Sequence, residues 1–132
     1  HSDTHLILDD KADWKSPTFN YVVEKIKYVF NMNIAATRLN YYQDGEYKPL
    51  HFDAAAINPE KEAVQNITIC ASFGSNREII FENAVTGTTM SIDITDGCVY
   101  TFGKMVNKTW RHGVKKGLGP RISIVCWGTV TR

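Results

Sequence analysis

Apolar residues recur at helical spacing in one segment near the start of the chain, from Ser16 to about Asn31. Ser16 can cap a helix, and Pro17 fits its first turn. Glu24 and Lys27 fall on the polar side, while the apolar residues stand three or four positions apart: Phe19, Val22, Val23, Ile26, Tyr28, Val29 and Phe30. The pattern predicts one amphipathic helix over about residues 17–31, packed against a sheet.

After Asn33 the pattern changes to short apolar or alternating runs with turn residues between them, which is typical of strands. The predicted strands are 35–42, 49–53, 66–73, 78–81, 88–93, 98–102, 109–114 and 121–129. Such a series predicts a mainly β domain with an N-terminal helix (α+β), built as a double-sheet jelly roll or related barrel with a core over about 35–129. Residues 54–64 lack a strand pattern and are predicted to form a loop over a site.

Length and composition limit the classes of protein. With 132 residues, the chain is expected to form a single domain over residues 1–132. No apolar run is long enough to cross a membrane, and the N-terminal residues do not resemble a signal peptide. Because His1 is not a natural start, we expect a piece of a longer intracellular protein, cytoplasmic or nuclear, that is monomeric. His5 and Trp14 lie in the same N-terminal region, and we expect Trp14 to be a core or cap residue.

Charge and cysteine content add two expectations. The net charge of +1 lacks the strongly basic character of a dedicated nucleic-acid binder. A local basic cluster remains, which we interpret as a solvated face in preference to a docking surface: Lys104, Lys108, Arg111, Lys115, Lys116 and Arg121.

Cys70, Cys98 and Cys126 occupy apolar, strand-like contexts without a CxxC pair, and buried reduced thiols are the simplest interpretation.

The segment His51-Phe52-Asp53 brings two metal-ligand residue types within one predicted strand. Positions i and i+2 of a strand point to the same face, so the imidazole and the carboxylate can bind one ion together. His112 lies on a later predicted strand that the sheet can bring across. A His-x-Asp motif or a single strand histidine is more often structural. Together, the two favour the two-histidine, one-carboxylate triad of non-haem iron(II) oxygenases.

Arg121 begins the apolar strand 121–129, and no acidic residue stands near it in the sequence. A guanidinium that points into a barrel is costly unless an anion neutralises it, and it suits a carboxylate such as the far end of 2-oxoglutarate. Ser123 faces the same side and can add a hydrogen bond. The alternative is a surface arginine paired with an aspartate or glutamate.

Several motifs recur in the order found in one family. They are Asn40-Tyr41-Tyr42 before the turn at Gly45, then His51-Phe52-Asp53, Asp96-Gly97, His112-Gly113-Val114 and Pro120-Arg121. From about Phe19 to Thr129, the chain resembles the AlkB-type branch of the iron(II)/2-oxoglutarate dioxygenases. The resemblance implies a double-stranded β-helix (jelly roll) that uses Fe(II), 2-oxoglutarate and O2.

The resemblance also implies residue roles. His51, Asp53 and His112 match the iron ligands, and Arg121 matches the residue that binds the distal carboxylate of 2-oxoglutarate. Asn40 and Tyr42 match an Asn-x-Tyr pair that hydrogen-bonds this co-substrate, and two strand residues at that spacing point the same way.

Two positions depart from the family pattern. A second arginine usually follows the first by six residues, and here that position is Trp127. Nucleic-acid repair members carry an acidic residue two positions after the metal aspartate, and here that position is Ala55. Both departures weaken an assignment to alkylated bases.

Three functions therefore stay open. The favoured one is an iron(II)- and 2-oxoglutarate-dependent dioxygenase that hydroxylates or oxidatively demethylates an N-alkylated nucleic-acid base, a protein side chain or a small metabolite. Residues 54–64 and 103–107 would form its substrate-side loops. The second is a degenerate jelly-roll module that only binds a partner. The third is a cupin-like metal enzyme that does not use 2-oxoglutarate.

Overall fold

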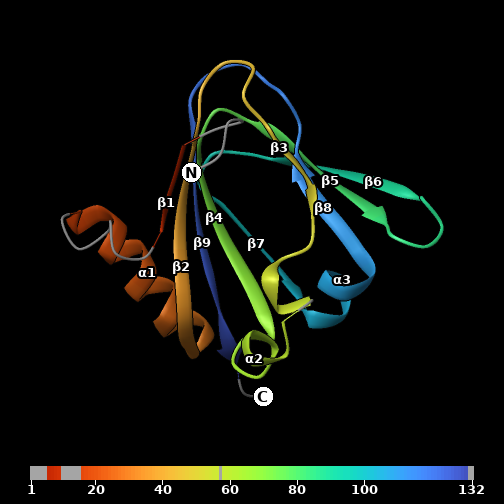
Figure 1. Ribbon diagram of the computed structural model, residues 1–132. Helices are drawn as coiled ribbons and strands as arrows, with labels where there is room; N and C mark the ends of the chain where they lie inside the picture. The colour runs from red at the N-terminus through yellow and green to blue at the C-terminus, as the bar shows by residue number, and fades with distance from the viewer. Residues whose placement is uncertain (1–5, 10–15, 57, 131–132) are drawn as a thin grey trace.

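A computed structural model describes residues 6–9, 16–56 and 58–130 of the chain (Figure 1). His1, His5 and Trp14 lie outside the described residues. In chain order the elements are β1 (Leu6–Asp9), α1 (Pro17–Phe30), β2 (Met32–Tyr42), β3 (Lys48–His51), a short 3-10 helix (Ala54–Ala56), α2 (Pro59–Glu62), β4 (Ile67–Gly74), β5 (Arg77–Asn83), β6 (Thr89–Ile94), β7 (Cys98–Gly103), α3 (Lys104–Thr109), β8 (Trp110–Val114) and β9 (Arg121–Val130).

The predicted N-terminal helix is confirmed. The hydroxyl of Ser16 accepts a hydrogen bond from the backbone N–H of Phe19, and Pro17 occupies the first turn. Asn31 adopts a left-handed conformation that ends the helix. The apolar face is narrower than the sequence pattern suggests, because the side chains of Tyr28 and Val29 are 85% and 63% exposed.

Two antiparallel sheets face each other across the molecule (Figure 1). The larger sheet has the strand order β1-β2-β9-β4-β7, and the smaller one has the order β3-β8-β5-β6. Helix α1 covers the outer face of the larger sheet. The prediction of a mainly β, double-sheet jelly roll with an N-terminal helix is therefore confirmed.

The larger sheet separates two apolar clusters. Ile69, Ala71 and Cys126 point outward and pack with Ile26 of α1. Residues on the inner face, together with those of the smaller sheet, form the second cluster: Tyr42, Ile79, Ile94 and Val114, with Phe81, Cys98 and Tyr100 packed around them. Because β4 and β9 are covered on both faces, their burial is nearly continuous. All three cysteines are free, as predicted, although Cys98 is only partly buried.

Some boundaries differ from the sequence predictions. The predicted loop 54–64 contains the 3-10 helix and α2, and the predicted loop 103–107 falls largely within α3. These turns are short and lack an apolar repeat, so no helical period marks them. Strand β1 was not predicted at all. No helix within the described ranges is long and apolar enough to cross a membrane.

Candidate metal centre

His51 and His112 meet because β3 and β8 are neighbouring strands and these two residues are partners in their register. Their ring centroids lie 4.3 Å apart. Gly113, next to His112, permits this approach, since a Cβ there would stand only 2.6 Å from the carbonyl oxygen of Lys48. The His-Gly pair therefore has a physical reason: the glycine lets β3 lie close enough for the two imidazoles to converge.

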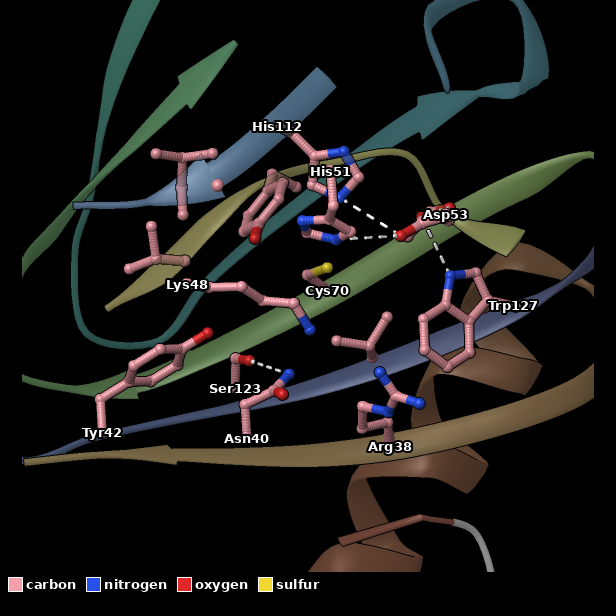
Figure 2. A pocket seen from close by; sticks show the side chains of 16 residues that line it. Arg38, Asn40, Tyr42, Lys48, His51, Asp53, Cys70, His112, Ser123 and Trp127 are labelled. Atoms are coloured by element: carbon pink, nitrogen blue, oxygen red, sulfur yellow. Dashed lines mark hydrogen bonds and ion pairs between the residues drawn. The ribbon is translucent and has the colours of Figure 1, made fainter. Parts of the chain in front are cut away.

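Asp53 completes the cluster (Figure 2). Its Oδ1 atom lies 3.5 Å from Nε2 of His51 and 3.3 Å from Nε2 of His112. One ligand atom from each of the three residues lies within 4.8 Å of the others, which makes them a group that can hold one metal ion. The structure therefore brings together the three side chains that the sequence analysis named.

The route by which Asp53 reaches the cluster differs from the prediction. Strand β3 ends at His51, so Asp53 stands in the segment that leads into the 3-10 helix. Its backbone N–H donates to Oδ1 of Asn107, at 2.8 Å, in place of a strand partner. Asn107 comes from α3 and is buried. Asp53 was predicted to lie on the same strand as His51, but it lies after the strand ends. The side-chain amide of Asn107, from α3, holds its backbone N–H there.

The carboxylate of Asp53 is held in one orientation. Its Oδ2 atom accepts hydrogen bonds from the hydroxyl of Thr68 and from Nε1 of Trp127, both at 3.0 Å. Oδ1 is left to face the two histidines. Burial alone would raise the pKa of Asp53, but hydrogen bonds with His112, His51 and Trp127 lower this pKa well below its usual range. The carboxylate is therefore ionised and presents one oxygen to the centre.

The two histidines direct their Nε2 atoms toward Oδ1 of Asp53. Nδ1 of His51 lies 2.9 Å from the carbonyl oxygen of Pro49, which only accepts, so Nδ1 carries the hydrogen. In neutral His51, the lone pair of Nε2 then faces Oδ1 of Asp53, another acceptor. Burial lowers the pKa of His112, which leaves its ring neutral at neutral pH. Without a metal, an imidazole N–H can hydrogen-bond to Oδ1 of Asp53. Once Nε2 of both rings is unprotonated, these two nitrogens and Oδ1 fit a divalent metal ion.

Replacing Trp127 with phenylalanine is expected to weaken metal binding about tenfold with the fold intact, because it removes one hydrogen bond that orients the ligand Asp53. Titration of the metal-free protein with Mn²⁺ measures the effect. Trp110→Phe is the matched control, since Trp110 does not line the pocket. Equal affinities of the two variants and the wild type would show that the Trp127 contact does not position the carboxylate.

The cluster of His51, Asp53 and His112 lies in a cavity between the two sheets. This cavity has about 430 Å³ of empty space, part of it open solvent. Asn40 and Tyr42 of β2 and Ser123 of β9, which the sequence analysis named, line its floor (Figure 2). Nδ2 of Asn40 donates to the hydroxyl of Ser123 at 3.1 Å, because the two residues are register partners. Asn40, Tyr42 and Ser123 therefore face the same cavity as the triad.

Arg121 is on the same face of β9 as Ser123, but it is not among the residues that line the cavity. It is 1% exposed and is the register partner of Tyr42, with its guanidinium carbon 5.3 Å from the centroid of that ring. Its Nε donates to the hydroxyl of Ser72, at 2.8 Å, whereas neither Nη1 nor Nη2 has a hydrogen-bond partner among the described residues.

Arg77 provides a comparison, because its guanidinium carbon also lies close to the Tyr42 ring, 5.6 Å from the centroid. It is 3% exposed, and its two terminal nitrogens donate to the carbonyl oxygens of Gln43, Glu46 and Gly119. Arg121 lacks such partners, and no acidic side chain of the described residues forms an ion pair with it. A buried guanidinium with both terminal nitrogens unpartnered is suited to a carboxylate supplied by a ligand.

Sequence reasoning missed several residues of this region. Thr68 and Asn107 fix Asp53, and Ser72 holds Arg121. Arg38 and Lys48 also line the cavity. The strand period places Arg38 on the same face as Asn40 and Tyr42, so that position carried a signal. Nothing local marks Asn107, because its role depends on a contact across 54 residues.

The predicted basic cluster is not a continuous cationic patch. Arg121 belongs to the interior, because β9 is covered on both faces. Lys108, Arg111 and Lys115 form ion pairs with Glu62, Glu82 and Glu78, respectively. The exposed members therefore form a largely neutralised surface, in line with the solvated-face interpretation.

No protein-family model matches the chain, and a search of curated proteins finds no match. Solved structures do resemble it. The structure of OsALKBH1 superposes with a TM-score of 0.60 and 14% identity, over 83% of this chain and 60% of that one. A 2OG-Fe(II) oxygenase family oxidoreductase from Burkholderia pseudomallei gives a TM-score of 0.57 and 17% identity, over 73% and 44%.

Oxalate oxidase in complex with glycolate gives a TM-score of 0.58 at 9% identity, over 98% of this chain and 53% of that one. At such identities the likeness shows the fold, which is the jelly roll that these proteins share with this chain. The chain spans 44% to 60% of the lengths of these structures. The metal cluster described above lies within that common fold.

Proposed function

We propose that this chain is the catalytic domain of an AlkB-like dioxygenase that depends on Fe(II) and 2-oxoglutarate. The observation that carries the proposal is that two features lie close together. One ligand atom of each of His51, Asp53 and His112 lies within 4.8 Å of the others. Arg121, whose terminal nitrogens have no hydrogen-bond partner among the described residues, lies against Tyr42 of the cavity floor. A metal ion would bind the three ligand atoms, and a dicarboxylate that also binds the metal would pair with the guanidinium of Arg121.

The likeness to OsALKBH1 and to a 2OG-Fe(II) oxygenase family protein supports the proposal through the fold. The order of the motifs along the chain supports the AlkB-like branch. When bound, Fe(II) would activate O2, which is the oxidant: oxidation of 2-oxoglutarate to succinate and carbon dioxide would supply two of the four electrons that O2 accepts, and hydroxylation of the substrate would supply the other two.

The residues of the chain have separate tasks in this reaction. His51, Asp53 and His112 would hold the metal, which would also bind the co-substrate and activate O2. Thr68 and Trp127 donate hydrogen bonds to Oδ2 of Asp53, which leaves Oδ1 to bind the metal.

The co-substrate half of the site lies along the cavity floor. Arg121 binds the distal carboxylate, and Tyr42 and the Asn40–Ser123 pair supply further hydrogen-bonding groups. The apolar side chains of Ile79, Val114 and Val125 line the same cavity and limit the access of water.

The substrate is proposed as an N-alkylated nucleic-acid base, which the enzyme would demethylate by hydroxylation and loss of formaldehyde. A protein side chain or a small molecule is the alternative. The AlkB-like order of motifs supports the base. Ala55, which is buried where repair members carry an acidic residue, and the neutralised basic cluster support the alternative.

Turnover tests the proposal. Iron-loaded protein is expected to form succinate from 2-oxoglutarate under air and to release formaldehyde with one member of a panel of methylated oligonucleotides and peptides. His51→Ala is the blank, and Lys116→Met, an exposed residue outside the cavity, is the control. Metal binding without 2-oxoglutarate binding would favour the cupin-like enzyme, and binding of neither would favour the partner-binding module.

A further inference from the structure

A second, smaller pocket adjoins the cavity that contains the three candidate metal ligands. It has about 190 Å³ of empty space, part of it open solvent. Thr68 and Trp127 line both pockets, so these two side chains form a common wall. The proposed function places the metal and the co-substrate in the larger cavity and gives the second pocket no role.

The second pocket is built by segments that lead to or from two of the candidate metal ligands. Ala55, in the 3-10 helix, follows Asp53 by two residues, and Asn107 belongs to α3, which leads directly into β8 and His112. Helix α3 also contacts the 3-10 helix. Figure 1 shows α2 and α3 at the same end of the molecule. The pocket is therefore part of the same group of connections as the metal cluster.

Three of the residues that line the second pocket use their polar groups to hold Asp53. Thr68 and Trp127 donate to Oδ2 of its carboxylate. Asn107 binds its backbone twice, since Oδ1 accepts from the N–H at 2.8 Å and Nδ2 donates to the carbonyl oxygen at 3.5 Å. A ligand that competed for these groups would disturb Asp53, so recognition in this pocket falls to another side chain.

Gln65 is the side chain that suits this task. It lies between α2 and β4, lines the second pocket and is 7% exposed. Its backbone N–H donates to the carbonyl oxygen of Glu62. Its side-chain amide forms no hydrogen bond with residues 6–9, 16–56 or 58–130. A buried amide is costly without hydrogen bonds, so a ligand that pairs with it gains affinity.

The chemistry of the second pocket favours a neutral amide as the bound group. A glutamine amide both donates and accepts, and a second amide offers the matching acceptor and donor. The buried polar side chains of the pocket are uncharged: Gln65, Thr68 and Asn107. Lys104 is the charged residue among the described residues that line it, and Lys104 is exposed. A charged group beside Gln65 would lose its hydration without a buried partner of opposite charge.

We propose that the second pocket is a substrate subsite in which Gln65 binds the neutral lactam edge of a nucleobase, a carbonyl group beside an N–H group. This inference rests on the proposed function, because it takes the bound group to be part of the substrate whose reacting methyl group lies at the metal. Gln65 is thereby a residue that determines specificity, one side chain away from Asp53.

Three molecules of the same shape separate the effect of charge from that of shape. Acetamide is neutral, acetate is anionic and acetamidinium is cationic. NMR titration of the chain, with and without Zn²⁺ as a diamagnetic metal, follows the side-chain amide of Gln65 and the indole N–H of Trp127. Acetamide is expected to shift both signals with a Kd on the order of millimolar, and to bind on the order of tenfold more tightly than the two ions.

Two variants test the role of Gln65 with the same titrations. Gln65→Leu is expected to weaken acetamide binding on the order of tenfold, measured at the Trp127 signal. Gln65→Glu is expected to reverse the order of affinity, so that acetamidinium binds more tightly than acetamide, because a carboxylate only accepts. Gln43→Glu makes the same change at an exposed position outside both pockets and should keep the wild-type order. Wild-type affinity for acetamide in Gln65→Leu, or an unchanged order in Gln65→Glu, would overturn the role of Gln65.

Thymidine and N-acetylglycinamide distinguish a nucleobase from a peptide as the source of the amide. Tighter binding of thymidine, lost in Gln65→Leu, supports the proposed subsite, whereas tighter binding of N-acetylglycinamide overturns it in favour of a peptide. Titration of the Mn²⁺-loaded protein with 2-oxoglutarate tests the proposed function separately. If 2-oxoglutarate binds and acetamide does not, the subsite is overturned and the proposed function stands. If acetamide binds and 2-oxoglutarate does not, the proposed function is overturned, and with it the assignment of this pocket to a substrate.

Discussion

Replacing Asp53 with asparagine is expected to weaken divalent metal binding on the order of a thousandfold while the fold persists. This loss corresponds to about 4 kcal/mol of metal-binding free energy, because the substitution removes the one anionic ligand. The fold persists because the amide can keep its oxygen toward Thr68 and Trp127 and turn its NH₂ group toward the acceptors of His51 and His112.

Asp53→Ala separates the metal effect from a structural one. It leaves the buried donors of Thr68 and Trp127 without an acceptor, so we expect it to lower the free energy of unfolding by about 1–3 kcal/mol, whereas Asp53→Asn should not. Mn²⁺ titration and thermal unfolding of the metal-free proteins measure the two effects. Retention of wild-type metal affinity by Asp53→Asn would exclude this carboxylate as a ligand.

Replacing Arg121 with methionine is expected to have opposite effects on binding and on stability. The affinity of the metal-loaded protein for 2-oxoglutarate should fall on the order of a hundredfold to a thousandfold, because the variant removes one partner of a buried charge pair. The metal-free, ligand-free protein should become more stable, by about 1–2 kcal/mol, because the variant removes a buried guanidinium whose terminal nitrogens have no hydrogen-bond partner within residues 6–9, 16–56 and 58–130.

Arg77→Met provides the matched comparison. It removes an equally buried arginine, but one that donates to the carbonyl oxygens of Gln43, Glu46 and Gly119. We expect this variant to lose about 2–3 kcal/mol of stability, because those buried acceptors lose their donors. Chemical unfolding of both variants without metal gives the comparison. Equal destabilisation of the two would mean that Arg121 is a structural residue like Arg77.

The parts of the site that were predictable from the sequence depend on local patterns. The strand period places Asn40 and Tyr42 on one face of β2, and Arg121 and Ser123 on one face of β9. These pairs meet because β2 and β9 are neighbouring strands, and no local pattern indicates this pairing directly. The fold class was predictable for a similar reason, since short strands with turn residues between them have few packing solutions.

The parts that were not predictable depend on contacts between distant segments. Thr68 and Trp127 bind the same oxygen of Asp53 although they stand 15 and 74 residues away from it. Trp127, which departs from the pattern of the family that the chain resembles, therefore orients the carboxylate of Asp53. The boundary of β3 at His51 was also missed, because Asn107 replaces the strand partner that Asp53 would otherwise have. No property of these residues alone identifies them.

The central claim is that His51, Asp53 and His112 form one metal site that a 2-oxo acid shares. Anaerobic titration of the metal-free protein with Mn²⁺, with and without saturating 2-oxoglutarate, tests it most directly. The account predicts one metal ion per chain and tighter metal binding in the presence of 2-oxoglutarate, since each ligand strengthens the binding of the other. The absence of stoichiometric metal binding, or an affinity for Mn²⁺ that 2-oxoglutarate leaves unchanged, would contradict it.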